Sequence, residues 1–244
     1  MCGIVASFHG GSVEETETIG RQLHHRGPDG SGIHLLPHGI LGHTRLAILD
    51  PAHGQQPYTW QGPSLTYNGE VYNFTSLARR YLPHIHMDSR TDTEVMFHML
   101  DMFWEEAIPL FDGMFSFVMM RGDSFIAARD PLGIKPLFYC QKDDEWHFAS
   151  EIKVLLPLNW PIREFPAGWY LDSATGWHQY FSLRERVSPF EGTKEDAYRL
   201  IREITARAVE KRLVSDVPLG VGLSGGLDSS IIAALARRHI EGLH

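Results

Sequence analysis

Two pairs of short strand-like segments, each joined by a polar turn, most strongly limit what this chain can fold into. One pair flanks the turn 121–123, and the other flanks the turn 142–144. The four segments are Met114–Met120, Ser124–Ala128, Leu137–Gln141 and Glu145–Ala149. Apolar runs separated by a few turn residues predict β-hairpins. The chain therefore needs antiparallel sheets.

Helical spacing interrupts the strands in two places. Asp92–Trp104 carries its apolar side chains on one helix face, and Glu14–Leu23 does so more weakly. Further strand-like stretches run over Cys2–Phe8, Gly39–Leu49 and Ser64–Tyr67. Paired antiparallel strands with separate helices predict an α+β layered domain that reaches to about residue 185.

The pattern changes near residue 190. Thr193 with Asp196 predicts a helix N-cap, and an amphipathic helix follows. A short apolar strand at Leu219–Leu223, a Gly-rich turn and a helix over Asp228–His239 come next. One strand and two helices cannot form an independent α/β nucleotide domain. Residues 191–244 are therefore predicted to be a fragment of such a domain or to dock on the first one.

Charge and cysteine content narrow the classes of function. The chain has 22 basic and 30 acidic residues, a net charge of −8 spread along its length. This argues against nucleic acid or an anionic membrane surface as the main partner. Cys2 and Cys140 are too few for a disulfide framework, and no run of about 18 apolar residues occurs. We expect a cytoplasmic protein that acts on small molecules.

Cys2 directly follows Met1 and opens the first predicted strand. Removal of Met1 would place a thiol and a free α-amino group on one residue. Such an amine has a pKa of about 7.7–8, so it can take the thiol proton and return it to a leaving group. The pattern predicts an N-terminal nucleophile; a small apolar residue without a chemical role is the alternative.

The run SGGLDSS at 224–230 lies between a predicted strand and a predicted helix. Gly225 and Gly226 let backbone N–H groups approach an anion, and a helix N-terminus adds its positive end. The run lacks the Lys of a Walker loop and the spacing of a dinucleotide fold. It predicts a phosphate site, with a Ser/Gly-rich turn and a capping side chain as the alternative.

Three polar positions in the first domain need more than packing to explain them. Asn68 and Gly69 place an amide side chain beside a flexible backbone N–H, the donors that an oxyanion needs, although Asn-Gly is also the commonest hairpin turn. Arg45 lies in an apolar strand, where a guanidinium needs a carboxylate from Asp50 or from a ligand. Asp92 fits a ligand role or a first-turn helix acid.

The histidines predict no metal site. His34 and His38 are four residues apart, but Pro37 between them argues against a helix, and no Cys or carboxylate completes a zinc set. We interpret both as surface residues. Cys140, within a predicted hairpin, is interpreted as an inert thiol.

The chain resembles the glutamine-hydrolysing asparagine synthetase family from end to end. HRGPDG and the TRLAILD strand recur across class II glutamine amidotransferases, and their pairing with SGGLDSS indicates the asparagine synthetase branch. The runs that carry the resemblance are MCGIVASF at 1–8, HHRGPDGSG at 24–32, HTRLAILD at 43–50, YNGEVYN at 67–73, RTDTEV at 90–95, RDPLGIKPLFY at 129–139, FASEIKVLL at 148–156, FPAGWYL at 165–171 and DVPLGVGLSGGLDSS at 216–230.

The resemblance implies a four-layer α/β/β/α N-terminal-nucleophile glutaminase domain over residues 1–190. Residues 191–244 would hold the first strand and helices of an α/β ATP-pyrophosphatase-type domain. The implied reaction hydrolyses glutamine to glutamate and ammonia, which passes through a channel to an ATP-activated aspartate and yields asparagine. Because the family's aspartate site follows this fragment, we expect this chain to retain only the glutaminase half.

The family's site residues match positions in this sequence. Cys2 would attack the glutamine amide with its own α-amino group as base, while Asn68 and Gly69 hold the oxyanion. Arg45 would bind the α-carboxylate of glutamine and Asp92 its α-ammonium. The other matching positions are Leu46, Ala47, Ile48, Leu49 and Glu70 for glutamine, and Leu223, Ser224, Gly225, Gly226, Asp228, Ser229 and Ser230 for ATP.

The complete family enzyme uses ATP and Mg²⁺, whereas glutamine hydrolysis needs neither. Two alternatives stay open: a relative with an acceptor other than aspartate, and a non-catalytic truncated subunit that pairs with a complete synthetase. Retention of Cys2, Asn68, Gly69, Arg45 and Asp92 argues against the second. The exposed faces of an interrupted α/β unit also leave a homo-oligomer open.

Overall fold

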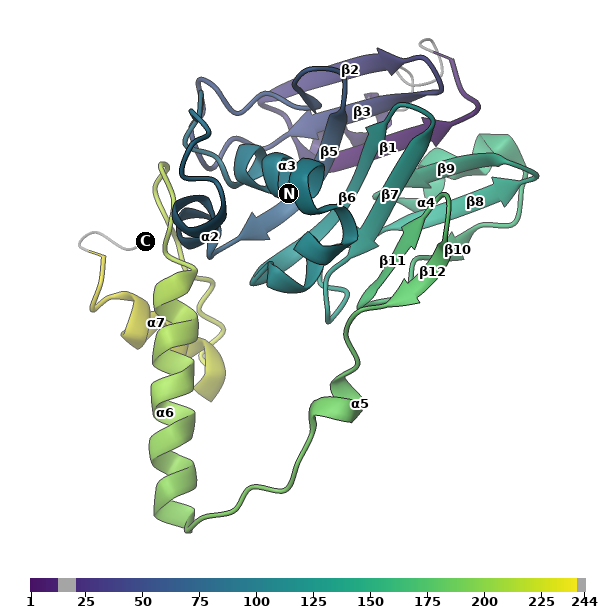
Figure 1. Cartoon of the computed structure of the whole chain (residues 1–244). Coiled ribbons are helices and arrows are strands. Elements are labelled where there is room, and N and C mark those ends of the chain that lie inside the picture. The colour runs from purple at the N-terminus through teal and green to yellow at the C-terminus, as the bar shows by residue number, and fades with distance from the viewer. Residues whose placement is uncertain (13–20, 241–244) are drawn as a thin grey trace. The chain divides into compact units, whose positions relative to one another are not determined.

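The computed structural model of the chain describes residues 1–12 and 21–240 (Figure 1). It divides into two compact units, Met1–Leu183 and Arg184–His244. The larger unit is built on two six-stranded sheets. None of the helices in the described parts of the chain has the length and apolar character needed to cross a membrane.

All strand pairings in the two sheets are antiparallel. The first sheet has the order β10-β8-β9-β1-β3-β2, with β1 (Gly3–Phe8), β2 (Gly30–Leu36), β3 (Gly39–Arg45), β8 (Phe138–Lys142), β9 (Glu145–Ala149) and β10 (Arg163–Glu164). The second has the order β12-β11-β7-β6-β5-β4, with β4 (Tyr58–Thr59), β5 (Ser64–Val71), β6 (Gly113–Arg121), β7 (Ser124–Arg129), β11 (Trp169–Asp172) and β12 (Gly176–Gln179). Cys2 thus directly precedes β1, a central strand.

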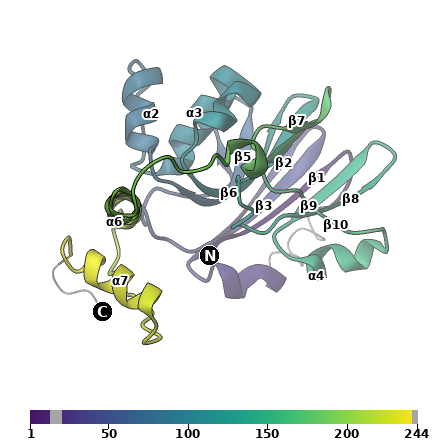
Figure 2. The same cartoon turned by 90° about the horizontal axis from the view of Figure 1, so that it is seen from below.

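Helices cover the outer faces of both sheets. On the second sheet lie α2 (Phe74–Tyr81), α3 (Asp92–Phe103) and the 3₁₀ segment η2 (Trp104–Leu110); on the first lie η1 (His24–Arg26), α4 (Ile152–Leu155) and η3 (Leu156–Leu158). Figure 2 shows α2 and α3 on one side of the sheets and α4 on the other. Since β5 contacts both β1 and β3, the sheets stack, and the predicted α/β/β/α order is confirmed.

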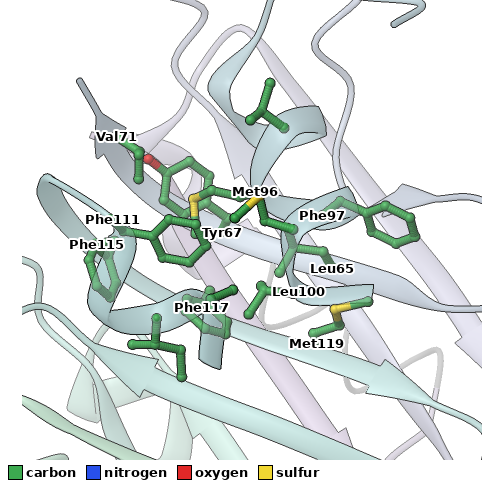
Figure 3. Packing of buried hydrophobic residues seen from close by; sticks show 14 of the residues in the cluster. Leu65, Tyr67, Val71, Met96, Phe97, Leu100, Phe111, Phe115, Phe117 and Met119 are labelled. Carbon is green, nitrogen blue, oxygen red and sulfur yellow. The ribbon is translucent and has the colours of Figure 1, made fainter. Parts of the chain in front are cut away.

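Successive side chains of a strand point to opposite faces of its sheet, and the apolar ones fill the spaces between these layers. Ile4, Ala6 and Phe8 of β1 join the cluster between the two sheets, whereas Val5 joins the cluster beneath α4. A third cluster lies between α3 and the second sheet; Figure 3 shows its members, which include Leu65, Tyr67, Met96, Phe97, Leu100, Phe117 and Met119. Both faces of each sheet are therefore packed, and the site at the head of β1 rests on a rigid base.

Both predicted hairpins are confirmed as β6–β7 and β8–β9, with ends shifted by one residue or so. The strand predicted over Gly39–Leu49 ends earlier, at Arg45, because the chain then leaves the sheet: the Ala47 N–H donates to Asp29 Oδ2 at 2.8 Å. The helix predicted over Glu14–Leu23 lies largely outside the described residues.

The smaller unit contains two main helices, α6 (Lys194–Lys211) and α7 (Leu227–Ala236), preceded by the short α5 (Leu183–Arg186) at its boundary. Thr193 caps α6 as predicted: its Oγ1 accepts from the Asp196 N–H at 3.1 Å. The strand predicted at Leu219–Leu223 was wrong, since this segment is irregular and pairs with no described strand. A lone strand has no partner for its backbone hydrogen bonds.

Candidate active site

A pocket of about 220 Å³ lies at the head of β1, bordered by β5, the loop after β3 and the start of α3. All predicted glutaminase residues line it except Ala47: Cys2, Arg45, Leu46, Ile48, Leu49, Asn68, Gly69, Glu70 and Asp92. A larger hollow of about 580 Å³ lies around Leu23 and Thr44 and includes none of these residues. The predicted chemistry therefore gathers in the smaller pocket.

Cys2 is held from several directions. Its Sγ accepts from the N–H of Leu46 at 3.4 Å and faces the Leu46 carbonyl at 3.8 Å. Its own carbonyl accepts from Arg26 Nε at 2.9 Å, and Arg26 Nη1 pairs with Glu151 Oε1 at 3.1 Å. The sulfur atom therefore has a fixed position at the pocket before any ligand arrives.

The acid–base properties of this end of the chain follow from its burial. Burial raises the pKa of the Cys2 thiol and lowers the pKa of the α-amino group at Met1. The positive charge of Lys135, a buried pocket residue, lowers the pKa of both groups. These shifts favour the free amine and the protonated thiol.

Asn68 and Gly69 lie inside β5, where they pair with Ser116 and Phe115 of β6. The alternative of an Asn-Gly hairpin turn was therefore wrong. Asn68 is 1% exposed, and within the described chain its Nδ2 has no hydrogen-bond partner. A buried donor left unpaired costs about 1–3 kcal/mol. Because Asn68 borders the pocket, this donor is available to an acceptor that enters it.

Gly69 is required by the spacing of the two strands. A Cβ at this position would lie 2.3 Å from the carbonyl oxygen of Met114, closer than two such atoms can approach. Gly69 also lines the pocket beside Asn68.

Arg45 ends β3 and is buried beside the pocket. Its Nη2 donates to the carbonyls of Leu49 at 3.0 Å and Asp50 at 2.8 Å, and its Nη1 donates to Pro51 O at 2.8 Å. A Cβ on Gly54 would lie 2.2 Å from Nη2, so glycine makes room for the guanidinium. Loop carbonyls orient this cation without neutralising it.

Of the two partners considered for Arg45, the Asp50 carboxylate forms no ion pair with it. That carboxylate accepts instead from the Arg90 N–H at 3.0 Å and lies 2.9 Å from His53 Nδ1. Among the residues that the structure describes, Arg45 forms no ion pair, so a negatively charged ligand is the partner left for it.

Asp92 is the first residue of α3, and Thr91 is the N-cap. Asp92 Oδ2 accepts from the Tyr67 hydroxyl at 2.7 Å and from the Val71 N–H at 2.9 Å. Burial raises the pKa of Asp92 and, together with the charge of Asp92, raises the pKa of Glu70 to about 8. The hydrogen bonds from Tyr67 and Val71 oppose the rise in the pKa of Asp92, so of the two carboxyl groups Asp92 is the better placed to carry the negative charge.

Sequence reasoning missed three functional residues: Arg26, Glu151 and Lys135. Each lies within a run on which the family resemblance rests, at 24–32, 148–156 and 129–139. These runs were therefore a signal. The hydrogen bond of Arg26 to Cys2, the ion pair of Arg26 with Glu151 and the place of Lys135 in the pocket appear only when distant segments are brought together.

The predicted phosphate loop belongs to the smaller unit. Gly226 is the N-cap of α7 and makes no side-chain capping bond, and Gly225 has a positive φ of 81°. The hydroxyls of Ser224 and Ser229 lie 3.0 Å apart, and Ser230 Oγ donates to Gly226 O at 2.7 Å. The seven predicted ATP residues lie together on this loop and the first turn of α7, almost all of them exposed.

Comparison with known proteins agrees with the division of the chain into a larger and a smaller unit. Residues 1–183 match the family model of the glutamine amidotransferase domain, and residues 200–244 match that of asparagine synthase. Over 259 residues the chain is 40% identical to the glutamine-hydrolyzing asparagine synthetase of Zea mays, and it is 38% identical over 266 residues to the probable glutamine-hydrolyzing asparagine synthetase of Schizosaccharomyces pombe. These alignments cover 99% and 100% of this chain but only 43% and 46% of the relatives.

Solved structures show the same fold. The glutamine phosphoribosylpyrophosphate amidotransferase of B. subtilis matches with a TM-score of 0.63 at 20% identity, over 97% of this chain and 64% of that one. The likeness shows that the two chains share a fold. The match over residues 1–183 shows that the chain belongs to the glutamine amidotransferase domain family.

Proposed function

We propose that the larger unit hydrolyses glutamine to glutamate and ammonia, with Cys2 as the nucleophile. The observation that carries this proposal is that one pocket is lined by Cys2, with its sulfur, and by Asn68, whose Nδ2 has no hydrogen-bond partner among the described residues. The relatives named as glutamine-hydrolyzing enzymes support the same substrate.

Charge complementarity orients the substrate in the pocket. A free amino acid carries one positive and one negative group, and the pocket presents Arg45 and Asp92. Binding the α-carboxylate at Arg45 and the α-ammonium at Asp92 leaves the side-chain amide to reach Cys2. The pocket volume of about 220 Å³ suits one amino acid rather than a larger ligand.

The reaction then follows from the groups at the head of β1. After loss of Met1, the α-amino group of Cys2 takes the thiol proton and the sulfur attacks the amide carbon. Asn68 Nδ2 and the Gly69 N–H donate to the oxyanion. The amine returns its proton to nitrogen, ammonia leaves as the C–N bond breaks, and water hydrolyses the thioester to glutamate.

Glutamate release from glutamine by the purified chain is the direct test, combined with intact-mass spectrometry to follow Met1. Glutamate release by chains that have lost Met1 is expected. A chain that has lost Met1 and releases no glutamate would contradict the proposal and favour a non-catalytic subunit.

Replacing Arg45 with lysine will raise the KM for glutamine by about 10–100-fold, with a smaller change in kcat. The reason is the loss of charge-assisted hydrogen bonds to the substrate carboxylate, each about 1.5–3 kcal/mol. Steady-state glutaminase kinetics measure both constants. Arg79→Lys on the exposed face of α2 is the matched control, and an unchanged KM in the Arg45 variant would remove the assigned carboxylate site.

We further propose that the complete reaction passes the ammonia to an ATP-activated aspartate, with the loop at 223–230 contacting the phosphates. The match to asparagine synthase over residues 200–244 supports this assignment. The uncapped N-terminus of α7 and the exposed serine hydroxyls fit a phosphate group, and the Asp228 carboxylate would suit the accompanying Mg²⁺. Bound ATP and Mg²⁺ would supply the activation of the acceptor carboxylate.

This chain will bind ATP and Mg²⁺ weakly. The described part of the smaller unit offers a loop and two main helices but no sheet to support a nucleotide pocket. Calorimetric titration with ATP and Mg²⁺ should show only a small saturable binding signal, and Asp228→Asn should abolish that signal. Tight, saturable binding that survives this substitution would contradict the assignment of the loop.

A further inference from the structure

Histidine and aspartate side chains from separate turns meet at the far end of β1 from the glutamine pocket. Cys2 precedes β1 and His9 follows it, whereas His38 directly precedes β3. Asp123 lies in the β6–β7 turn of the other sheet, and Asp144 lies in the β8–β9 turn. The His9 N–H donates to His38 O at 2.8 Å. This backbone bond fixes the spacing of the two histidines.

The distances within this cluster resemble those of a metal-ligand set. His9 Nε2 lies 3.0 Å and His38 Nδ1 lies 3.5 Å from the same oxygen, Asp123 Oδ1. One ligand atom from each residue lies within 4.8 Å of the other two. Ligands around a tetrahedral zinc ion, with bonds of about 2.0–2.2 Å, are separated by roughly 3.3–3.6 Å. Small side-chain rotations would bring all three atoms to that spacing.

Asp144 contacts His9 at the ring nitrogen that does not face Asp123. Its Oδ2 lies 3.2 Å from His9 Nδ1. A carboxylate in that place accepts from Nδ1–H, and the lone pair on Nε2 is then available to an ion bound between His9 and Asp123. The same pairing of carboxylate, histidine and ion recurs in metal sites. The His9 ring also stacks on Phe8 at 4.1 Å, which fixes its plane.

We propose that His9, His38 and Asp123 bind a divalent transition-metal ion, Zn²⁺ in the first place, with Asp144 as the residue that positions His9. Two imidazoles and one carboxylate suit zinc and its neighbours in the transition series rather than Mg²⁺, which takes oxygen ligands. The Asp123 side chain is 68% exposed, and a hollow of about 440 Å³ adjoins both histidines. An ion can therefore enter, and water can complete its coordination.

Such an ion would connect the two sheets. The histidines flank strands of the first sheet, and Asp123 lies between two strands of the second. An ion that binds only the folded chain raises its stability with the logarithm of the ion's excess over Kd. The site is therefore structural and independent of glutamine hydrolysis.

Calorimetric titration with Zn²⁺ tests the proposal in the parent chain and four variants. We expect one ion per chain, at least tenfold weaker binding in His38→Ala and in Asp123→Asn, and about 10–100-fold weaker binding in Asp144→Asn. His34→Ala is the matched control, because His34 lies in the same β2–β3 hairpin but outside the cluster. It should bind like the parent. Mg²⁺ should not compete.

Two further measurements identify the ligands. Co²⁺ should give the visible bands of nitrogen and oxygen ligands, whereas a sulfur charge-transfer band would show binding at a cysteine and overturn the assignment. Zinc should raise the Tm of the parent but not of His38→Ala, whose circular dichroism spectrum should match the parent's. Absence of saturable binding in the parent, or equal affinity in the parent and both ligand variants, would leave the cluster as a set of ion pairs.

Discussion

Replacing Cys2 with alanine is expected to reduce glutamine hydrolysis to background. Loss of a covalent nucleophile costs up to about 10⁶-fold in kcat, and no other described cysteine lines the pocket. The fold should be unchanged, because Cys2 lies outside the buried clusters between the layers. Glutamate release and a thermal melt measure the two effects.

Cys140 provides the matched control. It is the other cysteine of the chain, buried in β8, where burial raises its pKa to about 11 and keeps it a neutral thiol. Cys140→Ala should retain glutamine hydrolysis. Substantial turnover in Cys2→Ala, or loss of turnover in a folded Cys140→Ala, would remove Cys2 from its assigned role.

Replacing Asn68 with alanine is expected to lower kcat by about 10²–10³-fold, the usual effect of removing one oxyanion donor. KM should change little, because the donor acts on charge that develops only in the transition state. Stability should be kept, since Nδ2 makes no hydrogen bond within the described chain that the substitution could break. Glutaminase kinetics and urea unfolding measure these quantities.

Ser116→Ala separates catalysis from packing. Ser116 is the strand partner of Asn68, is fully buried, and likewise has an unpartnered oxygen in the described chain, but it does not line the pocket. It should therefore retain kcat. An equal fall in kcat for both variants, or an effect of Asn68→Ala on KM alone, would contradict the oxyanion role.

Local pattern predicted the hairpins well but could not place Asn68 and Gly69. Alternating apolar residues and adjacent turn residues are local signals, so β6–β7 and β8–β9 follow from sequence. Whether an Asn-Gly pair forms a turn or continues a strand depends on whether another strand pairs with it. Here β6, from a distant part of the chain, pairs with both residues. The absence of a strand at Leu219–Leu223 has the same cause: a strand exists only where another can pair with it.

The family runs identified most of the pocket, while its electrostatics came only from the structure. For Arg45 the sequence left Asp50 and a ligand as possible partners, because sequence does not reveal that loop carbonyls can hold a guanidinium. Which of Glu70 and Asp92 keeps its proton depends on burial and on their mutual distance, and neither is local information. The His9 cluster was missed for a similar reason: the sequence sets His38 beside His34, whereas the fold brings it to His9.

The hydrogen bond from Arg26 to the Cys2 carbonyl bears on how the protein would mature by removal of Met1. Met1 is 56% exposed, within reach of an aminopeptidase, while the residue behind it is already held at its carbonyl and at its sulfur. Trimming would then uncover a new terminus that is already ordered, so activation would require one cleavage and no rearrangement of the chain.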